Sequence, residues 1–540
     1  MTKRRRWPLW AVAAAGAIAV LVVGSAVGAP GQKGTQNLRM IIGAEPPSLD
    51  PGLATDTTSS NVLLNIFEPL IKLGPLPDLA PLPAAAQSWS VKGSTVTLNL
   101  RKSIRWTNGQ PVTAKDYVFS WKRTISPQLG ADYAYQFYGI KGAEAYNSCD
   151  PDKANCNALA AQVGVSAPSK YVLRVQLTSP QAWFIQQLSH HSFLPVHAAT
   201  IAKYGDKWTE ASNIVTDGPF NLTSWKHDAS LTLTKNPKFY RAGSVKLNKV
   251  TMTIITDGTT AENSYKAGNA DVNDQALPPA SIKSWRKNPE YKTFKAIGTY
   301  YYGFNIKNIP DVNQRRAMAV AIDRKAIVKY VAQGGQTPAT SFTPASTAGA
   351  PIINKNHFLP TIGQPAKAKA YMAKVQNLTR NVNLYVNNSP GHIQIATAVQ
   401  AFWKELGLNV NIKVQEWKQY LEFLGPPPNA DVSVYRLGWI YDYPDAQNGL
   451  VLWTCDSGNN NTNWCNKKYD GLITKASNTV SAAARFKLYQ QAETILTGPG
   501  GPLPLMPIYW YVYHTLAKPY VKGFFINPMD QYDLAQVSMS

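Results

Sequence analysis

The segment "GWIYDYPDAQ", residues 438–447, places one carboxylate, Asp442, among aromatic side chains. A carboxylate withdrawn from water needs a partner, because an unpaired buried charge is costly. The nearest basic residue is Arg436, six positions earlier, and none follows closely. Asp442 is therefore solvated, paired with a distant part of the chain, or paired with a cation that a ligand brings.

Motifs of known catalytic chemistry are absent from the sequence. It contains no H-E-x-x-H zinc motif, no G-x-S-x-G nucleophile elbow, no P-loop and no G-x-G-x-x-G dinucleotide motif. The adjacent histidines His190-His191 have no acidic residue at metal-ligand spacing, which favours a satisfied or exposed pair over a metal site. Binding without chemistry is the first hypothesis, and an exported hydrolase is kept as an alternative.

The four cysteines form two close pairs, Cys149 with Cys156 and Cys455 with Cys465, each separated by a polar loop. An exported chain enters an oxidising compartment, so two local disulfides are expected. Zinc ligands usually come in closer pairs such as C-x2-C, which makes a metal site the weaker alternative. No metal and no other cofactor is predicted.

The N-terminus has the pattern of an export signal. A basic cluster, Lys3 with Arg4–Arg6, precedes an apolar run from Leu9 to about Val23, and small residues follow. The pattern predicts a signal peptide at residues 1–29 and a linker at 30–35, hence an extracytoplasmic location at the cell surface or in the periplasm. A retained membrane anchor is the alternative, since the run is just long enough to span a bilayer. No cysteine ends the run, which excludes a lipid anchor there.

The composition describes a large, basic, folded protein. Of 540 residues, 44% are hydrophobic, enough for several cores, and the formal net charge is +22. Beyond the N-terminal cluster the basic residues are scattered, which indicates a solvated basic surface and not a nucleic-acid partner.

Periodic patterns predict a mixed α/β chain, with strands more frequent early and helices later. "TVTLNLR" places Val96, Leu98 and Leu100 on one face, and "YVLRVQL", "LTLTKN" and "KVTMTII" repeat this alternation. "HIQIATAVQAFWKELG" predicts a helix that is followed at once by the alternating "LNVNIKVQEW".

Two further helical segments leave details open. "DVNQRRAMAVAIDRKAIVKYVAQGG" predicts one helix or two, because Asp323 can cap a second start. "SAAARFKLYQQAETIL" predicts a helix whose inner face is formed by Ala484, Leu488, Ala492 and Ile495.

Several segments, in order along the chain, resemble one family. They are "RMIIGAEPPSLDPGLATDTTSSNVLLNIFEPL", "LRKSIRWTNGQPVTAKDYVFSWKR", "GDKWTEASNIVTDGPFNLTSW", "LTKNPKFYRAG", "GTYYYGFNI", "RRAMAVAIDR", "VQEWKQYLEFL" and "RLGWIYDYPDA". From about residue 38 to its C-terminus the chain resembles the extracytoplasmic oligopeptide- and dipeptide-binding proteins of ABC importers, solute-binding protein family 5.

The resemblance implies an α/β, two-lobed periplasmic-binding-protein-like fold (cluster C) with an additional domain on the first lobe. Lobe I would comprise residues 36–68, 214–300 and 508–540, the extra domain 69–213, and lobe II 301–507. The lobes would close over a ligand around a hinge of two strands. It also implies a monomer that delivers short peptides to the permease and ATPase subunits of an importer.

The resemblance implies roles for the residues around Asp442. Trp439, Asp442 and Tyr443 match the family's W-x-x-D-Y motif, in which the aspartate pairs with the peptide's α-ammonium. The peptide would lie extended and bond to the main chain near Gly438 and, on the opposite lobe, near Thr57.

Four further residues match positions that the family uses. Arg436 and His392 would bind the peptide's carboxylate, and Trp417 and Tyr301 would form pocket walls. The alternatives are an ion pair within one lobe for Arg436, a plain helix start for His392 and core positions for the two aromatic residues.

The chain also departs from the family's best-known members. Val331 replaces a lysine, Thr55 an acidic residue, Ala296 a tyrosine and Ile440 a cysteine. These changes leave the preferred peptide open. Because the same family includes binders of nickel, glutathione, sugars and haem, a non-peptide solute stays an alternative.

Overall fold

The computed structural model describes residues 35–540 except 75–78, 151, 153–154 and 426. The predicted signal peptide and nearly all of the predicted linker lie outside the described residues. Within the described residues, no helix combines the length and the apolar composition needed to cross a bilayer.

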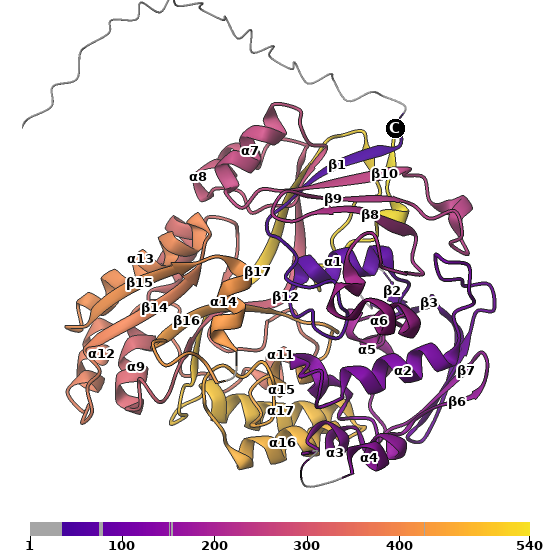
Figure 1. Cartoon of the computed structure of the whole chain (residues 1–540). Helices are drawn as coiled ribbons and strands as arrows, with labels where there is room; N and C mark the ends of the chain where they lie inside the picture. The colour runs from indigo at the N-terminus through magenta and orange to yellow at the C-terminus, as the bar shows by residue number, and fades with distance from the viewer. Residues whose placement is uncertain (1–34, 75–78, 151, 153–154, 426) are drawn as a thin grey trace, which may run out of the picture.

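A mixed sheet of eleven strands runs through the molecule (Figure 1). Its order, with bounds, is β15 (Asn409–Gln415), β14 (Asn381–Asn387), β16 (Val434–Ile440), β12 (Tyr291–Phe304), β17 (Leu505–Ala517), β11 (Val272–Asn273), β1 (Asn37–Ile42), β10 (Lys249–Ile254), β9 (Ser230–Lys235) and β8 (Phe220–Lys226), with β13 (Thr337–Pro338) beside β17. The alternation predicted for β9 and β10 is confirmed, because Leu231, Leu233, Val250 and Met252 are fully buried.

The two longest strands, β12 and β17, connect the two lobes. β12 pairs with β16 through Gly298–Phe304, whereas the far end of β17 pairs with β11 through Leu516 and Ala517. The register between β12 and β17 shifts twice, between Lys295 and Thr299 and between Tyr300 and Tyr301. Such irregularities bend a strand pair, which allows one sheet to serve both lobes. Figure 1 shows both strands running from the group with β1 and β8–β10 to the group with β14–β16.

A second, four-stranded sheet organises the segment between β3 and β8. Its order is β4 (Ala86–Lys92), β5 (Thr95–Leu100), β7 (Val172–Gln176) and β6 (Val165–Ser169). We call this sheet, with α2–α6 and their connections, the small-sheet domain. The predicted inner face of β5 is confirmed by the burial of Val96, Leu98 and Leu100. Two short pairs complete the strands: β2 (Ile71–Leu73) with β3 (Pro81–Pro83), and β18 (Val521–Lys522) with β19 (Ser538–Met539).

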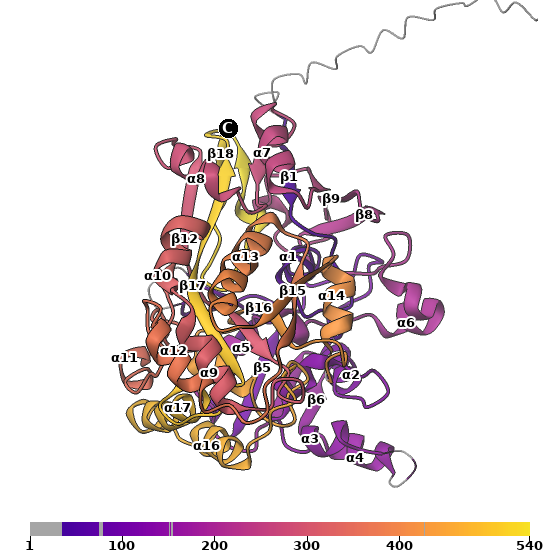
Figure 2. The same ribbon diagram turned by 90° about the vertical axis from the view of Figure 1, so that its left-hand side faces the viewer.

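Helices cover these sheets. In the first part of the chain they are α1 (Thr57–Ile66), α2 (Ala114–Thr124), α3 (Ala143–Asn147), α4 (Cys156–Gln162), α5 (Phe184–Gln187), α6 (Ala198–Tyr204), α7 (Gly258–Lys266) and α8 (Pro279–Trp285). The later ones are α9 (Val312–Ala321), α10 (Arg324–Ala326), α11 (Ala350–Ile353), α12 (Pro365–Met372), α13 (Pro390–Lys404), α14 (Trp417–Leu424), α15 (Ala446–Val451), α16 (Lys467–Ser477) and α17 (Ala482–Thr497). Figure 1 shows α9, α12 and α13 in the part of the molecule that carries β14–β16, and in Figure 2 this part faces the viewer.

The hydrophobic cores follow this division. One continuous core joins Met40 and Met252 of the first lobe to Leu98 and Trp121 of the small-sheet domain. Separate cores lie around α13 and around α15–α17. The small-sheet domain therefore packs onto the first lobe, and the α/β two-lobed class predicted from the sequence is confirmed.

Two helical predictions are resolved by capping and by polar burial. Asp323 accepts a hydrogen bond from the Ala326 amide at 2.7 Å, so a second helix does start there. The predicted inner face of α17 is confirmed for Ala492, which is fully buried, and for Leu488 and Ile495, which pack against the core, but it is wrong for Ala484. Ala484 is exposed, while Arg485 and Glu493 are buried because each has polar partners elsewhere in the chain.

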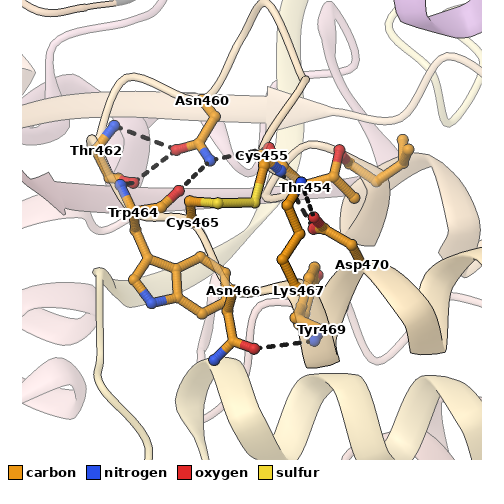
Figure 3. The surroundings of a disulfide bond; sticks show 11 residues. Thr454, Cys455, Asn460, Thr462, Trp464, Cys465, Asn466, Lys467, Tyr469 and Asp470 are labelled. Atoms are coloured by element: carbon orange, nitrogen blue, oxygen red, sulfur yellow. Dashed lines mark hydrogen bonds and ion pairs between the residues drawn. A yellow bond between two sulfur atoms is a disulfide. The ribbon is translucent and has the colours of Figure 1, made fainter.

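Both predicted disulfides, Cys149–Cys156 and Cys455–Cys465, are present. Figure 3 shows the second one, where the Asn460 amide donates to the carbonyls of Thr454 and Trp464. Asp470 lies beside this disulfide, but the two sulfur atoms are bonded to each other and are not free thiolate ligands. The loop between the two cysteines also supplies Asn459 and Asn461 to the wall of a cavity.

Candidate functional site

A cavity of about 540 Å³ lies where the two lobes and the small-sheet domain meet. This volume is in the usual range of small-molecule sites. Its wall draws on the start of α1, the small-sheet domain, β16, β17 and the start of α13, for example Thr57, Tyr133, Trp439, Tyr511 and His392. A ligand in this cavity would contact all three parts of the molecule at once.

One edge of β16 is open toward the cavity. β12 pairs with the whole of β16, whereas β14 pairs only with the first two residues of that strand. The Tyr441 amide bonds to Ile297 in β12, and main-chain groups of alternate strand residues point to the same edge. The main-chain groups of Gly438 therefore point to the other edge, where the described chain provides no strand. An extended ligand can pair with this edge.

Gly438 is needed for the close approach of β17. A Cβ atom at this position would collide with the hydroxyl of Tyr511. Both residues line the cavity, so the missing side chain of Gly438 makes room for the Tyr511 hydroxyl in the cavity wall.

Asp442 lies in the loop after β16, buried at the wall of the cavity. Its Oδ2 accepts hydrogen bonds from Gln136 Nε2 at 2.7 Å and Asn448 Nδ2 at 2.8 Å. Its Oδ1 accepts one from the Tyr133 hydroxyl at 3.3 Å and lies 3.0 Å from His190 Nε2. Three of these four partners belong to the small-sheet domain. Asp442 is thus paired with distant parts of its own chain, which the sequence left as one of three possibilities.

The partners of Asp442 are all neutral. The Ser192 amide, which can only donate, points to His190 Nδ1 at 3.4 Å, so that nitrogen is an acceptor and the ring proton is on Nε2. His190 therefore donates to Asp442 as a neutral imidazole. Four neutral donors stabilise a carboxylate without cancelling its charge. The negative charge of Asp442 stays available to a cation in the cavity.

Arg436 is the cationic counterpart on β16. Its guanidinium is buried, 4.4 Å from the centre of the Tyr300 ring, and donates to Tyr511 at 2.8 Å and to Asn387 at 3.2 Å. Its Nε has no partner, and no carboxylate of the described chain forms an ion pair with it. The alternative, an ion pair of Arg436 within its own lobe, is therefore not found among the described residues.

Three other predicted residues also line the cavity. His392 is in the first turn of α13, Trp417 begins α14, and Thr57 begins α1. Burial, and after it the charge of Arg436, holds the pKa of His392 well below its ordinary value, so this imidazole is neutral near pH 7. Trp439 lines the cavity as well, and its indole donates to Asn448 at 3.0 Å.

Two predicted residues do not line the cavity. Tyr301 is 1% exposed and packs edge-on against Phe342 and Trp453 in the core around α15–α17. Its prediction as a pocket wall is wrong in this structure, because its side chain points into that core. Tyr443 is also buried and hydrogen-bonds to Gln447.

The sequence reasoning missed other residues of the wall. His190 and His191 are buried and line the cavity, not exposed as was thought possible. Tyr509, Tyr511 and Tyr513 line it from β17. Alternate positions of a strand share a face, so the alternating tyrosines of "YWYVYH" indicate that one face of this strand is lined with tyrosine.

Comparison with known proteins decides the family. The model of bacterial extracellular solute-binding proteins, family 5 (middle region), matches residues 78–461. The chain belongs to this family. It is 32% identical over 495 residues to the oligopeptide-binding protein OppA of Bacillus subtilis, covering 89% of this chain and 88% of that protein. It is 33% identical over 512 residues to the dipeptide-binding protein DppE of the same organism, covering 91% and 89%.

Solved structures agree with the fold and bear on the lobe arrangement. Haemophilus influenzae OppA in complex with the peptide RPPGFSPFR gives a TM-score of 0.86 at 28% identity, covering 94% of this chain and 99% of that one. Escherichia coli MppA, a murein tripeptide-binding protein, gives 0.85 at 29% identity with the same coverage. The unliganded open form of MppA, also 29% identical, gives only 0.62, with coverages of 94% and 98%. The lobes of this chain are thus arranged as in the peptide complex and not as in the open form.

Proposed function

We propose that this protein captures short peptides outside the cytoplasmic membrane and passes them to an ABC importer. The observation that carries the proposal is the pair of Asp442 and Arg436, at opposite ends of the open β16 edge on one cavity wall. Neither has a formally charged partner among the described residues. A peptide brings the two complementary charges at its own ends.

The peptide would bind as an added strand. Its α-ammonium would pair with Asp442, its main chain with the open edge at Gly438, and its carboxylate with Arg436. Charge-assisted hydrogen bonds at both ends of the peptide would fix its direction in the cavity. Main-chain pairing reads no sequence, so a site of this kind accepts many peptides, with side chains placed among Trp417, Trp439 and the tyrosines of β17.

The spacing of the two charges suggests a peptide length. Arg436 and Asp442 are six positions apart, so the distance between their Cα atoms is at most about 20 Å in extended chain. Allowing for the reach of the arginine, an extended peptide of about three to five residues spans the distance. A dipeptide would leave one end unpaired.

Closure would use β12 and β17 as the hinge. We propose the lobe division that the resemblance implied, with boundaries near 300/301 and 507/508, inside these two strands and close to their register shifts. A peptide can contact Asp442, Arg436 and the start of α1 at the same time only when the lobes are closed. Peptide binding would therefore shift the equilibrium toward the closed arrangement.

Export and partners follow from the same proposal. Relatives are named as periplasmic or extracellular binding proteins. The N-terminal signal segment would carry this chain to the same side of the membrane, where permease and ATPase subunits would take over its ligand. The protein would act as a monomer and perform no chemistry.

One experiment separates this function from its alternatives. The purified protein is incubated with a mixture of defined tripeptides to pentapeptides, separated from free peptide, and denatured, and the released material is analysed by mass spectrometry. We expect intact peptides to be recovered. Recovery of fragments only would indicate a hydrolase, and recovery of none would indicate another solute.

A further inference from the structure

The wall of the cavity is acidic in a basic protein. The chain has a formal net charge of +22, yet the described residues of the wall include five carboxylates, one arginine and no lysine. The carboxylates are Asp56, Asp274, Glu416, Asp442 and Asp530. Acidic side chains therefore outnumber basic ones in this wall, in contrast to the protein as a whole.

The histidines of the wall do not offset these charges. His190 donates to Asp442 as a neutral ring, as its contact with Ser192 requires. Burial holds the pKa of His191 and of His392 well below the ordinary value. Burial, and after it the charge of Arg286, lowers the pKa of His514 to about 4. The rings of His191, His392 and His514 are therefore neutral near pH 7.

Three of the carboxylates, Asp56, Asp274 and Asp530, form what we call the acidic wall, on the first-lobe side of the cavity. Asp530 lies at the tip of a turn, with a φ of 58°, and its carbonyl accepts from Asn61 of α1 at 2.8 Å. Asp274 follows β11, and its amide donates to the Ile41 carbonyl at 3.0 Å. Both backbones are fixed by the fold, so both side chains are held at the cavity without a ligand.

The carboxylates of Asp274 and Asp530 have no ion-pair partner in the described chain. Burial raises the pKa of Asp530 to about 7, although a hydrogen bond from Thr57 opposes the shift. Burial and the nearby Asp530 raise the pKa of Asp274 well above its ordinary value. The free protein holds two acids close together at a cost that a cation would relieve.

Two nearby atoms also lack a donor. Asp56 is 8% exposed; one oxygen accepts from the Ser59 amide at 3.0 Å, and the other, Oδ2, has no partner among the described residues. His191 is 1% exposed; its Nε2 lies 2.9 Å from the Ala54 carbonyl and so carries the proton, which leaves Nδ1 a bare acceptor without a partner. Both residues line the cavity and both need a hydrogen-bond donor from outside the chain.

We propose that the acidic wall binds the cationic side chain of a peptide, so that the protein selects peptides containing lysine or arginine. The inference rests on the proposed function. A peptide with neutral side chains brings one ammonium and one carboxylate, which Asp442 and Arg436 already match. Over such a peptide Asp274 and Asp530 stay buried without a counter-charge, and burial keeps their pKa values raised. A lysine or arginine side chain supplies both the positive charge and the hydrogen-bond donors that stabilise the carboxylate forms.

The test compares lysine with norleucine, which has a similar stem and no ammonium group. Four tetrapeptides of alanine, each with lysine at a different position, are titrated calorimetrically against the protein, and so are their four norleucine counterparts. The variants are Asp274→Asn, Asp530→Asn and the double variant. The matched control is Asp206→Asn, an exposed aspartate of the small-sheet domain that does not line the cavity.

We expect lysine to bind at least about tenfold more tightly than norleucine at one or more positions. The double variant should abolish that ratio by weakening only the lysine peptides, and the control should keep it. The inference would be overturned if lysine and norleucine peptides bound equally well at every position. It would also be overturned if the preference for lysine persisted in the double variant. Either result would leave peptide binding itself intact. If neither series binds, the proposed function fails as well.

Discussion

His190 Nε2 lies 3.0 Å from the carboxylate of Asp442, and this contact joins the small-sheet domain to the loop after β16. Tyr133 and Gln136 reach the same carboxylate from the same domain. Asp442 therefore has two roles in the account: it closes the cleft through neutral donors and it keeps its charge for a ligand. The first role can be tested without changing the charge.

Replacing His190 with alanine should favour the open arrangement. The lost hydrogen bond is worth about 1–3 kcal/mol when its partner stays buried, so peptide affinity should fall about fivefold to a hundredfold. Titration calorimetry with tetra-alanine measures the affinity, and small-angle scattering of the free protein reports the opening. His357→Ala, at an exposed histidine, is the control. Unchanged affinity and an unchanged scattering profile would show that the contact does not hold the lobes.

Replacing Arg436 with glutamine should abolish recognition of the peptide's carboxyl end. In the native protein, amidating tetra-alanine should weaken binding by about tenfold or more, since a buried guanidinium loses its counter-ion. In Arg436→Gln the free acid and the amide should bind equally. If amidation weakens binding equally in both proteins, the peptide's carboxylate does not bind to Arg436. His392 or a solvent-exposed lysine then becomes the better candidate for its partner.

Adding a methyl group at Gly438 should displace the Tyr511 side chain of β17 and obstruct the ligand. The new Cβ meets the Tyr511 hydroxyl, and such overpacking costs about 1–3 kcal/mol. We expect Gly438→Ala to lower tetra-alanine affinity by at least about fivefold. Gly471→Ala in α16, where a Cβ would meet nothing within 4 Å, should bind normally. Normal binding by Gly438→Ala would argue against strand pairing at this edge.

The acidic wall makes stability depend on pH. Folding raises the pKa of Asp530 to about 7 from an ordinary value of 3.8, so between these values the folded state binds a proton that the unfolded chain does not. The free energy of unfolding should therefore fall as pH rises through this window. The groups around Asp530 are Thr57, Asp274, Tyr511, Tyr513 and Tyr532.

Asp530→Asn removes this dependence and also suits the backbone, because asparagine tolerates a positive φ. Melting curves should show the variant more stable than the native protein at about pH 8 and similar to it at about pH 4. Asp206→Asn again serves as the control. A variant less stable at the higher pH would mean that Asp530 is a favourable partner in the folded state.

The sequence was sufficient for the fold class and for two residues of the cavity wall. Alternation in β5, β9 and β10 predicted their buried faces because apolar side chains decide them locally. The motif around Asp442 and the position of Arg436 identified two groups that the structure does place on one wall.

What the sequence could not provide are contacts between distant segments. The inner face of α17 was predicted only in part, because Arg485 is buried by pairing with Asp445, which no helical periodicity reveals. Three of the four partners of Asp442 come from the small-sheet domain, and Asp530 approaches Asp274 only after the C-terminal segment returns to the first lobe. Tyr301 and Tyr300 looked equivalent in sequence, and only the pairing of β12 decides which way each one points.

The most direct test is a thermodynamic cycle between Asp442 and the peptide's amino group. Tetra-alanine and N-acetyl-tetra-alanine are titrated against the native protein and against Asp442→Asn. Acetylation should weaken binding to the native protein by about tenfold or more and should leave binding to Asp442→Asn unchanged, whatever the substitution does to folding. An equal loss on acetylation in both proteins would contradict the pairing of Asp442 with the peptide's ammonium group.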